Sequence, residues 1–200
     1  MLRASPPMFE SRVLDALSRV HPAVPVLIFG PVIVLLAAWG LSFVSVPATI
    51  GLFLAGYAFW TLFEYWLHRL VFHFEPDEGL GARLHWIIHG VHHDHPNDPM
   101  RLVMPPAVSI PLGAAVFGLM WLAVGHDAPA AGAGFFAGYL VYDMMHYYLH
   151  HFRPHGRLGR FLRERHMRHH FQDDTKGFGI SAPYWDDVFR TSPRARRSSQ

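Results

Sequence analysis

The sequence predicts an all-α integral membrane protein, in which four transmembrane helices form two hairpins and carry a cytosolic helical cap. Two observations lead to this fold class. Residues 22–63 and 102–125 contain no Asp, Glu, Lys, Arg or His, and about 20 apolar residues suffice to cross a bilayer as a helix. Helices of a soluble core rarely stay uncharged on every face for so long. The 16 histidines of the chain lie instead near the ends of these runs and in the segments that follow them.

Residues 1–23 are expected to form an N-terminal interfacial segment. Apolar Phe9, Val13 and Leu17 recur at helical spacing among charged residues, which is typical of an amphipathic helix that lies on a membrane surface. The segment has no small-residue cleavage site, so we do not interpret it as a cleavable signal peptide.

The membrane-embedded domain is expected to cover residues 24–190, and residues 191–200 are expected to form a disordered basic tail. Ser45-Val46-Pro47 divides the first charge-free run into two spans joined by a tight turn, and His126-Asp-Ala-Pro129 joins the second pair. Connections this short predict antiparallel neighbours. The four predicted spans cover residues 24–45, 48–68, 104–124 and 129–150.

Charge is distributed unevenly along the chain. Residues 1–150 hold 6 Lys or Arg and 10 Asp or Glu, whereas residues 151–200 hold 11 and 5. A basic C-terminal part is compatible with nucleic acid, but cytoplasmic positive charge and anionic headgroups explain it in a membrane protein, so no nucleic-acid partner is expected. Arginines before the first span and after the fourth place both termini on the cytoplasmic side. The absence of Cys excludes disulfides and thiolate metal ligands.

The histidines form four clusters. Two clusters are triplets at i, i+3 and i+4, whose rings project from one face of a helix, and a third is a pair at i, i+4. The fourth cluster is a pair whose members are five residues apart, so they share a metal only if the helix unwinds or bulges. The predicted topology brings all four clusters to one membrane face. The candidate ligands are His68, His73, His89, His92, His93, His146, His150, His166, His169 and His170.

Ten imidazoles are enough for two metal ions with four or five ligands each. Neutral imidazole is the commonest metal ligand among side chains. Ordinary interfacial histidines are the alternative, but ten buried polar groups without partners would cost roughly 10–30 kcal/mol at about 1–3 kcal/mol each. A typical total stability is only about 5–15 kcal/mol. We therefore predict a dimetal site.

Three further residues are expected to support the ligands. Glu64 stands four residues before His68 and Asp143 three before His146, so each carboxylate can accept the second ring N–H of its ligand. For Asp143, a hydrogen bond with Tyr147 or an Arg is the alternative. His85 lies one turn before His89. The other histidines are expected at the surface or, for His151, on another helix face; they are His21, His95, His126, His151 and His155.

Ligand type alone does not choose between iron, zinc, copper and nickel. The site lies against lipid, so its substrate is expected to be an acyl or isoprenoid chain, whose C–H bonds are not acidic. Oxidising such bonds requires oxygen chemistry and a redox-active metal. We therefore predict two iron ions, with zinc as a substitute in purified samples, and O2 as co-substrate.

Several motifs carry a resemblance across residues 60–190. They are Glu64-Tyr-Trp-Leu-His68-Arg, His89-Gly-Val-His92-His93, Arg101-Leu-Val-Met-Pro-Pro106, Asp143-Met-Met-His146, Arg165-His166-Met-Arg-His169-His170 and Trp185-Asp-Asp-Val-Phe189. In these motifs the chain resembles the fatty acid hydroxylase/sterol desaturase superfamily, and most of all the catalytic core of the fatty acid 2-hydroxylases that act on sphingolipid acyl chains.

The resemblance implies a membrane di-iron monooxygenase that hydroxylates a lipid acyl chain at the 2 (alpha) carbon. The ten histidines fall on the ligand positions of the family. Eukaryotic members often carry an N-terminal cytochrome b5 domain, for which this chain has no room. Electrons are therefore expected from a separate donor, either cytochrome b5-like or ferredoxin-like, and the basic C-terminal part is a candidate docking site for it.

The Ala-, Arg- and Pro-rich composition favours a bacterial inner membrane, or the endoplasmic reticulum in a eukaryote, with the metal site on the cytoplasmic side. Two alternatives stay open. One is a carotenoid or sterol hydroxylase or desaturase of the same superfamily. The other is a membrane metal-binding or transport protein, which would need polar residues through the middle of its spans, where this sequence is apolar.

Overall fold

The structure, a computed structural model, describes residues 4–193, and these residues contain helices but no strand. Two short π-helical turns (η1, η2) and one 3-10 turn (η3) interrupt or join the helices. In chain order the elements are α1 (Arg12–Leu17), α2 (Ala23–Gly40), α3 (Val46–Leu67), η1 (His68–Phe72), α4 (Gly79–His85), η2 (Trp86–Gly90), α5 (Val91–Asp94), α6 (Pro106–Val124), η3 (Gly125–Asp127), α7 (Ala128–His151), α8 (Arg157–Phe171) and α9 (Tyr184–Val188).

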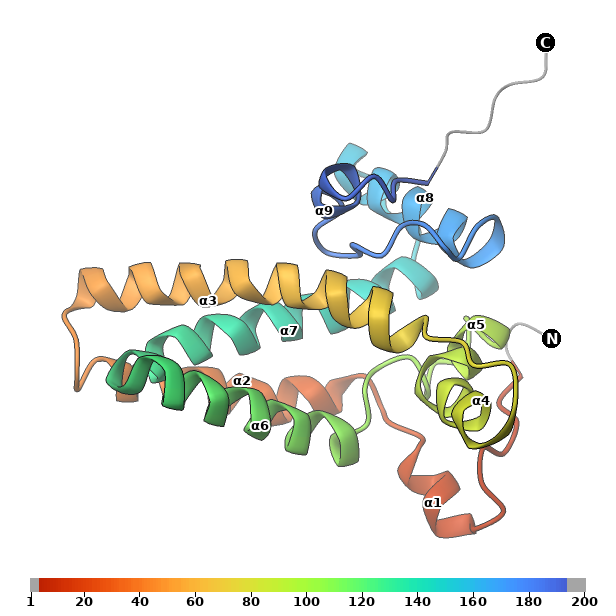
Figure 1. The fold of residues 1–200 in the computed structure, drawn as a ribbon, viewed down its shortest axis with the longest axis horizontal. Coiled ribbons are helices and arrows are strands. Elements are labelled where there is room, and N and C mark those ends of the chain that lie inside the picture. Colours follow the sequence, from red (N-terminus) through yellow and green to blue (C-terminus); the bar gives the residue numbers. More distant parts are fainter. Residues whose placement is uncertain (1–3, 194–200) are drawn as a thin grey trace.

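Three stretches of helix are long and apolar enough to cross a membrane: Ala23–Gly40, Val46–Phe72 and Pro106–His151. The third stretch has 46 residues because it joins α6 and α7 through the tight turn η3, where Gly125 adopts a φ of 55° that favours glycine. Figure 1 shows α2 and α3 as one hairpin and α6 and α7 as a second, with both tight turns at the same end. The shorter helices gather around the opposite end.

The core of the bundle is built around α7, which packs against both α2 and α3. An aromatic cluster fills this interface. Trp60 of α3 meets Phe135 edge-on at 5.1 Å between ring centroids, and Phe29 of α2 meets Tyr139 edge-on at 4.8 Å. Such pairs stabilise beyond their buried area by about 0.5–1.5 kcal/mol. The cluster fixes the helices whose far ends carry histidines.

Helices α3 and α7 approach each other to backbone contact at two glycines. A Cβ atom added to Gly56 would lie 1.8 Å from the carbonyl oxygen of Ala131, and one added to Gly134 would lie 1.8 Å from that of Phe53. Small residues at such positions allow close helix packing in membranes. We expect Gly56→Ala to lower stability by about 1–3 kcal/mol, the usual range for overpacking, as measured by thermal unfolding in detergent.

Gly51 on the same helix is the matched control, because a Cβ atom there would meet nothing within 4 Å. Gly51→Ala is expected to leave stability unchanged or to raise it by up to about 1 kcal/mol, the difference in helix propensity between the two residues. Equal destabilisation by both substitutions would contradict the close approach.

The N-terminal segment is fastened to the segment that precedes α6. An Arg101 guanidinium nitrogen lies 2.7 Å from a carboxylate oxygen of Asp15, and the Val20 amide donates to the Met100 carbonyl at 2.7 Å. Helix α1 exposes apolar side chains, with Val13 68% and Leu17 58% accessible. An interfacial helix would bury these side chains among lipid headgroups.

At the C-terminal end, the first residue of the predicted tail packs against the rest of the chain. Thr191 is buried, and its hydroxyl donates to Asp186 at 2.8 Å and lies 2.9 Å from the Tyr65 hydroxyl. The chain is therefore folded as far as Thr191, because this residue provides internal hydrogen bonds. Of the rest of the predicted tail, residues 192 and 193 are described and residues 194–200 lie outside the described residues.

Candidate metal centre

The ten predicted histidines gather at one end of the bundle in two groups of five, in each of which one candidate ligand atom per residue lies within 4.8 Å of the others. We name the groups site A and site B. Site A consists of His68, His73, His89, His93 and His169, and site B consists of His92, His146, His150, His166 and His170.

Site A combines side chains from three parts of the chain. His68 begins η1 and His73 follows it, His89 and His93 lie in η2 and α5, and His169 lies in α8. Their Nε2 atoms converge. The Nε2 of His89 lies 3.2 Å from that of His68 and 3.0 Å from that of His93, and the Nε2 atoms of His73 and His169 are 3.0 Å apart.

The π-helical turn η1 brings His68 and His73, which are five residues apart, to the same side of the helix. The His73 amide donates to the His68 carbonyl at 3.1 Å, so residues five apart are stacked one turn above the other. Single π turns of this kind recur at functional sites. Residues five apart can share a site only if the helix bulges between them, and η1 is that bulge. The second π turn, η2, ends at Gly90 beside His89 and was not predicted.

Site B combines α5, α7 and α8. The Nε2 of His92 lies 3.0 Å from that of His146 and 3.0 Å from that of His170. The Nε2 of His166 lies 2.7 Å from that of His150 and 3.2 Å from that of His170. The sites are adjacent, since the rings of His93 and His170 stack with centroids 4.2 Å apart.

Each histidine triplet contributes two residues to one site and its middle residue to the other. In each half of the chain, the span-end pair and the i, i+4 histidines of the following triplet enter the same site. The middle histidine of each triplet enters the other site, so that His92 joins site B and His169 joins site A. Each triplet therefore links both sites, and each site takes four histidines from one half of the chain and one from the other.

The chemistry of the donors suits metal ions. Metal–imidazole bonds of about 2.0–2.1 Å keep two nitrogens on one ion within about 4 Å of each other. The Nε2 pairs described above, at 2.7–3.2 Å, satisfy this limit. The histidines are also held neutral, the form that binds metal. Burial lowers the pKa of His73 to about 3, that of His92 to about 3 and that of His169 to about 4. The clusters can therefore bind metal ions at neutral pH.

In three site A ligands, the ring nitrogen that points away from the site, Nδ1, faces an oxygen acceptor. The Nδ1 atoms of His68 and His169 each lie 2.7 Å from a backbone carbonyl, that of Phe178 and that of Lys176. The Nδ1 of His73 lies 3.5 Å from a carboxylate oxygen of Glu75. Sequence reasoning missed these three acceptors. Only Glu75 left a signal, as an acidic residue two positions after a ligand.

Of the three predicted supporting residues, Glu64 and Asp143 are buried and His85 is half-buried. The two carboxylates act differently from the prediction. Glu64 accepts hydrogen bonds from the Ile180 and Ser181 amides, both at 2.8 Å, and from the Ser181 hydroxyl. The prediction that Glu64 accepts from His68 is wrong, because that ring faces the Phe178 carbonyl instead.

Asp143 likewise binds the chain around it and no cluster histidine among the described residues. Its carboxylate accepts from the Met104 amide and the Tyr139 hydroxyl, both at 3.4 Å. A tyrosine partner was the stated alternative, although the tyrosine is a different one. His85 lies 3.7 Å from the Glu75 carboxylate, so it shares that carboxylate with a site A ligand.

Outside the two groups, His21, His126 and His155 are exposed as predicted. His95 is half-buried rather than fully exposed; it follows α5, and its carbonyl accepts from the Asp98 amide at 3.0 Å. His151 is half-buried and packs against Tyr147 at 4.4 Å between ring centroids.

An apolar cavity of about 240 Å³ reaches both sites. Its wall includes His89 of site A and His92 of site B. The rim carries exposed apolar side chains, among them Leu17 of α1, Ile88 of η2 and Val108 of α6. The cavity thus connects the paired histidine groups to a surface that is suited to lipid.

A helical bundle with membrane-length helices and two imidazole clusters at one end defines a membrane-associated protein with a candidate dimetal centre. The fatty acid hydroxylase family model matches residues 53–191. A dihydroceramide fatty acyl 2-hydroxylase of Arabidopsis thaliana is 38% identical over 97% of this chain and 83% of its own length. The chain belongs to the fatty acid hydroxylase family.

Other relatives agree. The human fatty acid 2-hydroxylase is 41% identical over 74% of this chain and 41% of its own length. A solved structure of full-length scs7p, in which only the hydroxylase domain is visible, superposes with a TM-score of 0.86 at 34% identity. That superposition covers 93% of this chain and 72% of the other.

Proposed function

We propose that this protein is an O2-dependent di-iron monooxygenase that hydroxylates a lipid acyl chain at the 2 (alpha) carbon. The observation that carries the proposal is the pair of five-imidazole groups beside an apolar cavity, with one histidine of each group in the cavity wall. The names of the Arabidopsis and human relatives support the 2 position.

The ten histidines of sites A and B would hold the two ions. Bound iron supplies the redox chemistry that an unactivated C–H bond demands. The protein contributes the binding and orientation of the acyl chain and the exclusion of water. Burial keeps the imidazoles neutral, and the backbone carbonyls behind His68 and His169 fix which ring nitrogen faces the ion.

The cavity would hold the acyl chain. Each CH2 group that leaves water for an apolar wall contributes about 0.8 kcal/mol, so a chain of several CH2 groups is bound without polar contacts. The carbon to be oxidised would lie near His89 and His92, and the rest of the chain would extend towards the apolar rim formed by Leu17, Ile88 and Val108.

Filling the cavity is expected to weaken turnover without affecting metal binding. Ala107 lines the cavity from α6 and is exposed, so Ala107→Trp should insert and fold while its indole occupies acyl space. We expect kcat/KM for long-chain lipids to fall by about tenfold or more, equivalent to about 1.4 kcal/mol. Ala115→Trp, at an exposed position on the same helix outside the cavity, is the matched control; equal losses in both variants would argue against this acyl site.

We also infer the membrane arrangement from composition. α2, α3, α6 and α7 would each cross the bilayer, and the histidine end would lie on the cytoplasmic side with both termini, as the arginine distribution indicates. A bacterial inner membrane suits the Ala-, Arg- and Pro-rich composition. Electrons would come from a separate cytochrome b5-like or ferredoxin-like donor that docks on the basic C-terminal part.

The deciding experiment expresses the protein together with a cytochrome b5 or ferredoxin reducing system and analyses hydrolysed lipids by mass spectrometry. We expect 2-hydroxy fatty acids that are absent from cells producing a His92→Ala variant. Hydroxylated carotenoids or sterols without 2-hydroxy acids would favour the other enzymes of the superfamily. Metal accumulation without any oxidised lipid would favour a transport or storage role.

A further inference from the structure

The two sites differ in how the ligand rings are held from behind. In site A, carbonyls of one loop, residues 176–181, face the Nδ1 atoms of His68 and His169 at 2.7 Å each. In site B, the Nδ1 atoms of His166 and His170 are buried and have no hydrogen-bond partner among the described residues. Two imidazoles of site A therefore have a hydrogen-bond acceptor behind the ring, whereas two imidazoles of site B have none among the described residues.

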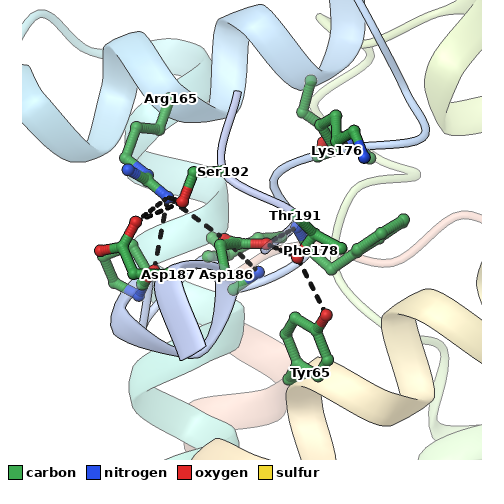
Figure 2. Close-up of polar contacts among 12 residues, drawn as sticks. Tyr65, Arg165, Lys176, Phe178, Asp186, Asp187, Thr191 and Ser192 are labelled. Carbon is green, nitrogen blue, oxygen red and sulfur yellow. Dashed lines mark hydrogen bonds and ion pairs between the residues drawn. The ribbon is translucent and has the colours of Figure 1, made fainter. Parts of the chain in front are cut away.

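A buried carboxylate holds the bracing loop in place. Asp186 is 0% exposed and accepts from the Phe178 amide at 2.9 Å and from the Gly179 amide at 3.1 Å. Figure 2 shows these bonds around Asp186 and Phe178. Asp186 thus fixes the amide of Phe178, and the carbonyl of the same residue faces His68. The carboxylate therefore influences the orientation of the His68 ring through Phe178.

The same carboxylate ties together the two helices that supply these ligands. Its partner Thr191 donates to it at 2.8 Å and accepts from the Tyr65 hydroxyl of α3 at 2.9 Å. On the other side, an Arg165 nitrogen of α8 lies 3.6 Å from Asp186 (Figure 2). Helix α3 leads to His68 and α8 carries His169, so one buried network sets the position of both rings.

Glu64 holds the far end of the loop through the Ile180 and Ser181 amides. A loop this short forms few backbone hydrogen bonds of its own, and an ionised carboxylate can accept several N–H groups at once. Two buried acids therefore hold four successive amides of the loop, those of residues 178–181. Acceptors behind a ligand imidazole fix its tautomer and strengthen it as a donor.

We propose that Asp186 is a positioning residue for site A, and that site A consequently retains its metal ion more firmly than site B. This inference rests on the metal binding that is part of the proposed function. It concerns the protein's own residues and does not depend on which lipid is oxidised.

The test measures metal release from the purified full chain in detergent, loaded with two equivalents of Zn²⁺ and mixed with excess colorimetric chelator. Zinc is used because it has no redox chemistry. We expect two phases of release, with the fast phase from site B. His166→Ala, which removes a site B ligand, is expected to abolish the fast phase and leave the slow phase in place.

Asp186→Asn is expected to accelerate the slow phase by about 10–100-fold, the usual effect of losing an outer partner of a metal ligand, and to leave the fast phase unchanged. Asp187→Asn is the matched control, because this neighbouring carboxylate is 65% exposed; both phases should stay as in the wild type. Thr191→Val, which removes one donor to Asp186, provides a milder variant with a smaller change in the same direction.

Release in a single phase would overturn the inequality of the sites. Equal acceleration of both phases by Asp186→Asn would show a general loss of structure and overturn the positioning role. A protein that releases zinc as expected but forms no 2-hydroxy lipid contradicts only the proposed function. A protein that hydroxylates lipid but releases both ions alike contradicts only this inference, whereas failure to bind zinc contradicts both.

Discussion

Replacing His169 with alanine is expected to lower the metal content from two ions per chain to about one and to reduce lipid hydroxylation by at least about 100-fold. His169 is the single ligand that α8 gives to site A, and its back nitrogen is braced by the Lys176 carbonyl. Without it, site A loses both a donor and its connection to α8. Metal content by mass spectrometry and 2-hydroxy acids in hydrolysed lipids measure the two effects.

The matched control is His155→Ala, which removes an exposed histidine that belongs to neither group. His95→Ala, outside both groups as well, is expected to be nearly silent. Extraction of membranes at high pH should show that all three variants remain inserted, because none of these residues lies in the apolar bundle. If His155 or His95 proved essential and His169 dispensable, the ligand assignment would be wrong.

Replacing the metal is expected to separate binding from chemistry. Removal of the metal by a chelator should abolish turnover, and ferrous iron should restore it under reducing conditions. Zinc should fill the same sites, because imidazole ligands suit both ions, yet turnover should stay below about 1% of the iron-loaded value because zinc has no redox chemistry. The measurement is turnover per bound ion across both preparations.

A protein preparation treated identically but never depleted of metal controls for damage by the chelator. Recovery of hydroxylation with zinc alone would contradict a mechanism based on oxygen activation by a redox-active metal. If neither metal restores hydroxylation although the ions are bound, and the preparation kept at full metal content is still active, the chelator has damaged the protein.

Much of the fold could be predicted because the relevant signals are local. A run such as residues 22–63 contains no charge or histidine. Backbone N–H and C=O groups without hydrogen-bond partners are costly in a bilayer, so such a run is expected to form a helix. Tight connections such as Ser45-Val46-Pro47 then lead to hairpins. The composition of each stretch was sufficient for this, without any long-range contact.

The ten clustered histidines were also accessible from the sequence, because i, i+3 and i+4 spacing places their rings on one helical face. Their division between two sites was not. Successive residues on a helix turn by about 100°, so the middle histidine of a triplet points to one side of its i, i+4 partners. Which site it enters depends on where the other helices stand, as His92 and His169 demonstrate.

The sequence by itself therefore determined the long apolar helices, the two hairpins and the residues able to gather at one end. Only the tertiary structure decided the exchange of His92 and His169 between the sites and the carbonyl acceptors behind His68 and His169. The physical reason is that every residue has a carbonyl, so a brace such as that of Phe178 has no sequence signature. It exists only because Asp186 and Glu64 fix the loop in space.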